Sequence, residues 1–280
     1  MDHPYLFQNA AVILFRLIVY NILIGIYGWL VHLASFRRKK ARQFVKGRLG
    51  WKDRLEEFSA DGKPVIWVHC ASLGEFEQGR PVIESLKLSF PEIKILLTFF
   101  SPSGYEIRKD YSKADAVWYL PLDTPSNARQ FVSGLNLQLA IFVKYEVWPN
   151  YFAQLQKAEV ELLMISAIFR EDHRYFKWWG GFFRRALKRV SYFGVQTEHS
   201  GQLLESIGIK DWEVIGDTRF DRVLTIAENI SSLAILEEFK GSEKLVVMGS
   251  TWPMDEKALA LLLKQKSETF KIVIAPHEIS

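Results

Sequence analysis

The stretch that decides the fold is VIWVHCASLGEFEQGR, residues 65–80. It begins with a continuous apolar run at residues 65–68, which is typical of a strand buried on both faces of a parallel sheet. Small residues then form a turn, and a helical pattern begins at Glu75 and continues toward Leu88. In open α/β proteins such a strand–turn–helix unit places its turn at the edge of the sheet where ligands bind. Glu75 therefore lies where a carboxylate either caps its helix or takes part in chemistry.

Short apolar segments alternate with helical segments along the chain that follows. Proline falls at element edges, where its missing N–H does least harm, at Pro91, Pro121 and Pro149. The alternation predicts an α/β fold with a parallel, doubly wound sheet. The predicted strands are residues 93–99, 116–120, 138–143, 161–168 and 192–196, and the predicted helices are residues 103–113, 124–135, 149–158 and 198–207.

A second strand–helix–strand unit follows a transition at residues 216–240. Its strands are predicted at 245–248 and 270–275, with a helix at 254–266 between them. Two parallel strands do not make an independently stable sheet, so we expect this domain to be incomplete in the present chain. The expected domains are residues 1–50, an anchor helix with a basic segment, residues 51–217, and the incomplete domain at 218–280.

The composition is that of a globular protein with a sizeable core. Of the 280 residues, 49% are hydrophobic and 24% are charged, which excludes a disordered chain. The single cysteine, Cys70, forms no internal disulfide, which fits a reducing compartment. No second Cys or His stands at zinc-ligand spacing near Cys70, so a buried core thiol is the preferred interpretation.

The N-terminal segment at residues 10–36 is apolar and long enough to span a bilayer, which needs roughly 20 residues. Arg16 and His32 interrupt it, and Arg16 lies near one end, where it could snorkel outward. The alternative is a hydrophobic helix docked on the protein's own surface. Cations directly after an apolar span mark the cytoplasmic side and attract anionic lipids, a better explanation than nucleic-acid binding. We therefore expect everything after Phe36 to lie in the cytoplasm and to face the inner leaflet of the membrane. The basic residues are Arg37, Arg38, Lys39, Lys40, Arg42, Lys46, Arg48, Lys52 and Arg54.

The common nucleotide motifs are missing. No G-x-G-x-x-G follows the first strand, so the dinucleotide fingerprint is absent. The run from Gly74 to Pro81 resembles a P-loop, but Arg80 replaces the lysine and Pro81 has no hydroxyl for Mg²⁺. There is also no D-x-D pair for a metal on a sugar nucleotide, which favours a metal-independent mechanism.

Two carboxylates follow predicted parallel strands at the same edge of the sheet. Ser72 and Glu75 have the spacing of a capping box, and general-base chemistry by Glu75 is the alternative. Glu146 follows the strand at 138–143 and precedes Pro149, which opens the next helix. Each acid could merely cap its helix, but two at one edge favour function.

The stretch RYFKWWGGFFRRALKR, residues 174–189, combines basic and aromatic residues without an acid. A surface helix with an aromatic inner face is one interpretation. An interfacial helix in contact with anionic lipid is the other, and the sequence does not decide between them.

Seven motifs occur in an order that resembles the 3-deoxy-D-manno-octulosonic acid (Kdo) transferases. They are HCASLGE, LLTFFSPSGYE, YLPLD, YEVWPN, VIGDTRFD, GSTWPMDE and VIAPHE, and they cover residues 67–278. The resemblance implies a GT-B architecture, with a Rossmann-like acceptor domain followed by a Rossmann-like donor domain. It also implies metal-independent, inverting transfer of Kdo from the substrate CMP-Kdo to a lipid A precursor, lipid IVA, without a cofactor. A GT-B enzyme that uses a UDP-sugar and a non-catalytic membrane-associated lipid-binding protein are the alternatives.

The resemblance also implies roles for individual residues. Glu75 matches the family's catalytic base, and Glu146 matches a glutamate held to stabilise the transition state. Arg219 stands where the family has a lysine, and Lys144 stands where many relatives have an acid. Donor contacts are expected from Ser250, Thr251, Pro276 and His277. Acceptor or membrane contacts are expected from Ser72, Gly74, Arg80, Arg174, Lys177, Arg184 and Arg185.

Overall fold

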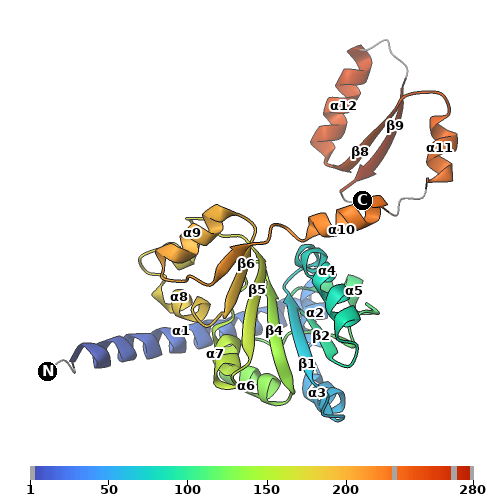
Figure 1. Cartoon of the computed structure of the whole chain (residues 1–280). Coiled ribbons are helices and arrows are strands. Elements are labelled where there is room, and N and C mark those ends of the chain that lie inside the picture. The colour runs from blue at the N-terminus through green and yellow to red at the C-terminus, as the bar shows by residue number, and fades with distance from the viewer. Residues whose placement is uncertain (1–3, 229–231, 266–269, 278–280) are drawn as a thin grey trace. The chain divides into compact units, whose positions relative to one another are not determined.

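The computed structural model describes residues 4–228, 232–265 and 270–277. The chain forms two compact units, residues 1–223 and 224–280 (Figure 1). This division falls inside helix α10 (Arg219–Glu228), whereas the sequence suggested a boundary after Asp217. Residues 1–50 and 51–217 pack together in the first unit.

The first unit is built on a seven-stranded sheet whose strands all run parallel. The spatial order is β3-β2-β1-β4-β5-β6-β7, so the chain reverses its direction of growth between β1 and β4. The predicted doubly wound sheet is confirmed, and β7 is an additional short strand. The strands are β1 (Val65–Cys70), β2 (Lys94–Phe99), β3 (Ala116–Tyr119), β4 (Leu137–Val143), β5 (Glu161–Ala167), β6 (Tyr192–Val195) and β7 (Trp212–Val214).

Strand β1 lies at the centre of this sheet. Trp67 pairs with Leu96 of β2 on one side and with Ala140 of β4 on the other. The β1 side chains alternate between two cores: Trp67 packs into one, and Val68 and Cys70 pack into the other. The predicted two-sided burial and the predicted buried thiol are both confirmed.

Helices cover both faces of the sheet. The core that holds Val68 and Cys70 contains Phe76 and Ile83 of α4, and the core that holds Trp67 contains residues of α3, α6, α7, α8 and α9. The stretch at 174–189 is a 3₁₀ turn and a short helix rather than one long helix. The helices are α2 (Lys39–Lys46), α3 (Trp51–Ser59), α4 (Leu73–Ser89), α5 (Pro102–Arg108), α6 (Pro125–Ser133), α7 (Pro149–Lys157), η1 (Arg174–Phe176), α8 (Gly181–Leu187) and α9 (Glu198–Ser206).

Helix α1 (Pro4–Ser35) runs from the side of α8 to the side of α2 (Figure 1). Its half-buried residues recur at helical spacing, so one face rests on the domain along much of its length. The Tyr20 hydroxyl donates to Asp123 Oδ2 at 2.8 Å, and Asn150 Nδ2 donates to Asn21 Oδ1 at 2.9 Å. The part from Leu14 to Ser35 is also long and apolar enough to cross a membrane. The half-buried positions include Leu17, Tyr20, Asn21, Ile24, Gly28 and Val31.

Arg48 does not belong to the basic surface that the sequence suggested. Its guanidinium is buried and donates to the carbonyl oxygens of Phe44, Phe100 and Leu120 at 2.8–2.9 Å. Burial lowers its pKa to about 9. The carbonyls of Phe100 and Leu120 directly follow β2 and β3, so Arg48 fastens the segment after α2 to the sheet edge. Including Arg48 among the lipid-facing cations was therefore wrong.

The second unit contains the predicted strand–helix–strand motif. Strand β8 (Leu245–Thr251) pairs in parallel with β9 (Lys271–Pro276), and α12 (Pro253–Gln265) connects them. Helix α11 (Ala234–Lys240) precedes β8, in the region that the sequence marked only as a transition.

Candidate active site

The two predicted carboxylates flank the point at which the order of the strands reverses. Glu75 lies in the first turn of α4, directly after β1, and Glu146 lies three residues beyond the end of β4. Strands β1 and β4 are neighbours in the sheet, and successive connections leave them in opposite directions. The carboxyl edge at such a point is where open α/β sheets form their ligand crevice.

Glu75 is 6% exposed, and its carboxylate folds back to accept a hydrogen bond from the N–H of Ala71. Burial raises its pKa, whereas the Ala71 N–H, the Lys144 charge and the Ser72 N–H lower it, and the net change is upward. The Ser72 side chain makes no capping hydrogen bond, so only the glutamate half of the expected capping box is present. Glu75 thus fixes the β1–α4 turn and is at the same time a stronger base than an ordinary carboxylate.

Glu146 has a pKa raised to about 7. Burial is the largest cause, and the charge of Glu75 raises the pKa further, while Arg174 opposes both. Near neutral pH, Glu146 is therefore close to half protonated. Two interacting acids whose pKa values are shifted by their environments are a common basis for dividing acid and base roles.

The turn between β4 and Glu146 is strained. Lys144 has φ of +67°, in the left-handed region that a side chain disfavours, and its N–H donates to the Ile165 carbonyl at 2.9 Å. Non-glycine residues in this region concentrate at ligand sites because the surrounding structure holds them there. The turn ends β4 and brings the charge of Lys144 close enough to lower the pKa of Glu75.

Asp123 holds the loop that follows Glu146, a role that the sequence did not reveal. Its buried carboxylate accepts hydrogen bonds from the N–H groups of Asn150 and Tyr151 at 3.1 and 2.9 Å. It also accepts the Tyr20 hydroxyl, and burial raises its pKa to about 6. Trp148, at the start of α7, provides no capping side chain, so Asp123 caps this helix from a distance. In sequence, Asp123 precedes Thr124 and Pro125 and suggests only a local helix start.

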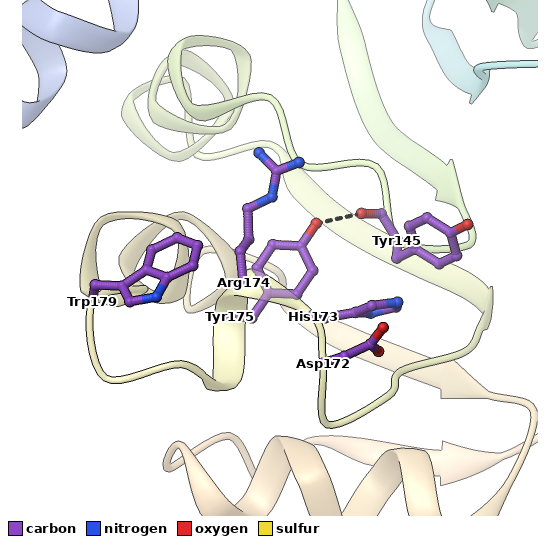
Figure 2. A pocket seen from close by; sticks show the side chains of 6 residues that line it. All are labelled: Tyr145, Asp172, His173, Arg174, Tyr175 and Trp179. Carbon is purple, nitrogen blue, oxygen red and sulfur yellow. Dashed lines mark hydrogen bonds between the residues drawn. The ribbon is translucent and has the colours of Figure 1, made fainter.

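Two cavities adjoin each other at Arg174, and Glu146 lines one of them. One, of about 250 Å³, is lined by Glu146 itself, Tyr20, Arg174 and Phe183 among others. The other, of about 330 Å³, shares Arg174 with it (Figure 2). Figure 2 shows Arg174 and Trp179 on one side of this second cavity, opposite Tyr145, His173 and Asp172. Tyr175 braces the wall, since its hydroxyl donates to the Tyr145 carbonyl at 2.8 Å. The structure thus brings Arg174, predicted to contact the acceptor, to the catalytic candidate Glu146.

The remaining acceptor candidates differ in their surroundings. Gly74 is exposed beside Glu75, and a β-carbon there would meet no atom within 4 Å, so the space is open. Arg80 pairs with Glu84 at 2.7 Å on α4 itself. Arg184 Nη1 donates to the carbonyls of Tyr175 and Lys177 at 3.1 and 2.8 Å. Arg185 is exposed.

Arg219 begins α10 and pairs with Asp217, with Nη2 at 2.5 Å from Oδ2. Burial raises the pKa of Asp217, but the Arg219 hydrogen bonds outweigh it, and the pKa falls to about 2. Thr218 anchors this motif to α4, because its hydroxyl donates to the Gln78 carbonyl at 2.6 Å. In this structure the Arg219 guanidinium faces Asp217.

The four donor candidates converge at the carboxyl ends of β8 and β9 in the second unit. Ser250 Oγ and His277 Nδ1 are 2.9 Å apart, and the His277 N–H donates to the Thr251 carbonyl at 2.9 Å. Pro276 pairs with Thr251 in the sheet register, and the Trp252 ring stacks on His277 with ring centroids 4.4 Å apart.

Solved structures of two other enzymes share this fold. The UDP-GlcNAc 2-epimerase of Neisseria meningitidis, bound to UDP-GlcNAc, is 17% identical with a TM-score of 0.55 and covers 75% of this chain and 64% of its own. A putative UDP-N-acetylglucosamine 2-epimerase of Listeria monocytogenes is 13% identical with a TM-score of 0.54 and covers 76% of this chain and 62% of its own. At this level of identity they show the fold alone, and they confirm the expected GT-B class.

Sequence comparison identifies the family. The curated 3-deoxy-D-manno-octulosonic acid transferase of Rickettsia felis is 29% identical over 225 residues, which are 79% of this chain and 48% of the relative. That of Haemophilus influenzae is 26% identical over 196 residues, 68% of this chain and 45% of the relative. The chain spans about half the length of these relatives. The family model described as 3-deoxy-D-manno-octulosonic-acid transferase (kdotransferase) matches residues 44–222. The chain therefore belongs to the Kdo transferase family.

Proposed function

We propose that this protein is an inverting, metal-independent glycosyltransferase that moves Kdo from CMP-Kdo to lipid IVA in lipopolysaccharide core biosynthesis. The observation that carries the proposal is the pair of carboxylates at the β1/β4 reversal: Glu75 is buried and has a raised pKa, and Glu146 is half-buried and has a pKa of about 7. Membership in the Kdo transferase family supports the chemistry.

Glu75 acts as the general base. Its carboxylate takes the proton from a hydroxyl of the acceptor, and the resulting oxygen attacks the anomeric carbon of Kdo from the face opposite CMP. The bond between that carbon and the phosphate oxygen breaks, and CMP leaves with the electron pair. The open space beside Gly74 leaves room for the acceptor next to this base.

Glu146 and the cations stabilise the transition state. In its protonated form Glu146 donates a hydrogen bond to a developing negative charge. Arg219 supplies positive charge for the phosphate or carboxylate of the donor. To do so, its guanidinium leaves the ion pair with Asp217 and binds the donor instead. Ser250, Thr251, Pro276 and His277 bind CMP-Kdo in the second unit. No cofactor or nucleic acid takes part.

The protein works at the cytoplasmic face of the inner membrane. Helix α1 exposes apolar side chains away from its docked face, including Ile22 and Trp29. Phe36, directly after the helix, is also exposed, and Trp178 is 90% exposed. Cations from Arg37 to Lys46 follow this helix and attract anionic lipids. Arg174 adds charge in both cavities, and Lys177 and Arg185 add charge to the same segment, residues 174–189.

Purified 280-residue chain should convert CMP-Kdo and lipid IVA into a Kdo-lipid product detectable by mass spectrometry, with or without EDTA. UDP-sugars should give no product. The Glu205→Gln variant, which changes an exposed acid on α9, should match the parent. Turnover of a UDP-sugar instead of CMP-Kdo would refute the donor assignment. If the protein binds the lipid but neither binds CMP-Kdo nor turns it over, the non-catalytic alternative is favoured.

A further inference from the structure

An apolar groove lies between α1 and the segment that includes α8. It has a volume of about 330 Å³. The Tyr20 ring packs against Phe182 and Phe183, with centroids 5.5 and 6.3 Å apart, and forms part of its wall. Tyr20 and Phe183 also line the cavity that contains Glu146, so the groove and that cavity adjoin. The groove is lined by Phe15, Arg16, Val19, Tyr20, Leu23, Trp179, Phe182 and Phe183.

Two guanidiniums converge beside this groove, over Gly181. A β-carbon on Gly181 would lie 3.5 Å from Arg16 Nη1 and 3.7 Å from Arg184 Nη2. Within the described ranges, 4–228, 232–265 and 270–277, no carboxylate forms an ion pair with either arginine. Arg184 Nη1 donates to two backbone carbonyls, and Arg184 Nη2 lies on the side of Gly181 where Arg16 Nη1 also lies. Two cations held together without an acid suit a phosphate group.

We propose that this groove binds an acyl chain of the phosphorylated lipid acceptor and that Arg16 and Arg184 bind its phosphate. The inference rests on the proposed function and deepens it by assigning α1 to the acceptor site. The groove supplies an apolar wall for a chain, and the arginine pair supplies the charge for the phosphate. The adjoining cavity contains Glu146. A lipid bound in the groove therefore lies next to the proposed catalytic residues, which is the position that an acceptor requires and a bilayer phospholipid does not.

The docking of α1 follows from the same geometry. The hydrogen bonds of Tyr20 and Asn21 to the domain hold the helix beside α8, which keeps the groove formed. A helix that left the domain to cross the bilayer would lose these bonds and open the groove. In this proposal helix α1 stays docked on the domain and forms a wall of the acceptor site.

The site can be tested without turnover. A lipid IVA analogue with a diazirine in one acyl chain is photolysed with the full chain in detergent micelles, and the adducts are mapped by mass spectrometry. Adducts are expected at the groove residues Phe15, Val19, Leu23, Trp179, Phe182 and Phe183. Adducts confined to the outward face of α1, at Ile22, Trp29 and Leu33, would overturn the proposal, and so would an absence of adducts. A diazirine analogue of phosphatidylglycerol should label the groove at least fivefold less, and equal labelling would assign the groove to bilayer lipid.

Substitutions test the binding of the acyl chain and the binding of the phosphate separately. Leu23→Trp fills the groove and should raise KM for lipid IVA at least tenfold while leaving KM for the deacylated acceptor unchanged. Arg16→Gln should raise KM for both acceptors, and Gly181→Ala, whose methyl group enters the space between the arginines, should do the same. The controls Leu88→Trp and Arg129→Gln lie on exposed positions of α4 and α6 and should match the parent. Unchanged KM values in both Leu23→Trp and Arg16→Gln would overturn the proposal. If the chain proves inactive with CMP-Kdo, only the proposed function fails, and photolabelling still decides the groove.

Discussion

Replacing Glu146 with glutamine should change how the stability of the protein depends on pH. The pKa of Glu146 rises from 4.5 to about 7 on folding, which corresponds to about 3 kcal/mol of folding free energy. Because the folded-state pKa is raised, this contribution is fully present below pH 4.5 and is lost as the pH rises through 7. Glutamine has no proton to lose, so the Glu146→Gln variant should become more stable relative to the parent by about 3 kcal/mol between pH 4 and pH 8.

Urea unfolding followed by circular dichroism and tryptophan fluorescence measures this difference. The free energy of unfolding is determined for both proteins at several pH values across that range, with the urea dependence (the m-value) compared at each pH. Titrating groups that do not interact with Glu146 affect both proteins alike and cancel in the difference. Glu205→Gln serves as the matched control and should run parallel to the parent. Parallel curves for the parent and Glu146→Gln would show that Glu146 is not perturbed and would refute the acid–base division of the site.

Three further substitutions test the supports of the site. Asp123→Ala should destabilise the protein by about 2–4 kcal/mol, because it leaves two buried N–H groups and the Tyr20 hydroxyl without their acceptor; an unchanged melting temperature would contradict its role. Arg48→Met should lower the free energy of unfolding by about 2–3 kcal/mol, since three carbonyls lose their donor. Binding of the variant to anionic vesicles should be unchanged, and a loss of binding would show that Arg48 contacts lipid. Gly79→Ala places a methyl group 3.0 Å from Cys70 Sγ, so chemical denaturation should show a loss of about 1–3 kcal/mol; a neutral result would mean that α4 can move away from the sheet.

The features with regular periodicity could be predicted from the sequence. The apolar run at 65–68 and the alternation after it define a parallel sheet, and the ends of parallel strands meet at one edge. Glu75 and Glu146 could therefore be placed together without a structure. The short strand β7 was missed because its three residues are partly exposed and form no apolar run.

The residues that depend on tertiary contacts could not be predicted. Arg48 stands among exposed cations in sequence, and only the fold brings it to the carbonyls beyond β2 and β3. Asp123 acts on α7 from 27 residues away. The pairing of Arg16 with Arg184 depends on which face of α1 docks, and an almost uniformly apolar helix does not reveal that face.

The rate of Kdo transfer by the Glu75→Gln variant tests the central claim most directly. Glutamine can still accept the Ala71 hydrogen bond that fixes the β1–α4 turn, but it cannot take a proton. With CMP-Kdo and lipid IVA, kcat should fall by about 10²–10⁴-fold. The free energy of unfolding should stay within about 1 kcal/mol of the parent, the usual size of a capping effect. A variant that keeps its kcat, or that loses activity only in proportion to its folded fraction, would show that Glu75 is a helix cap and not the base.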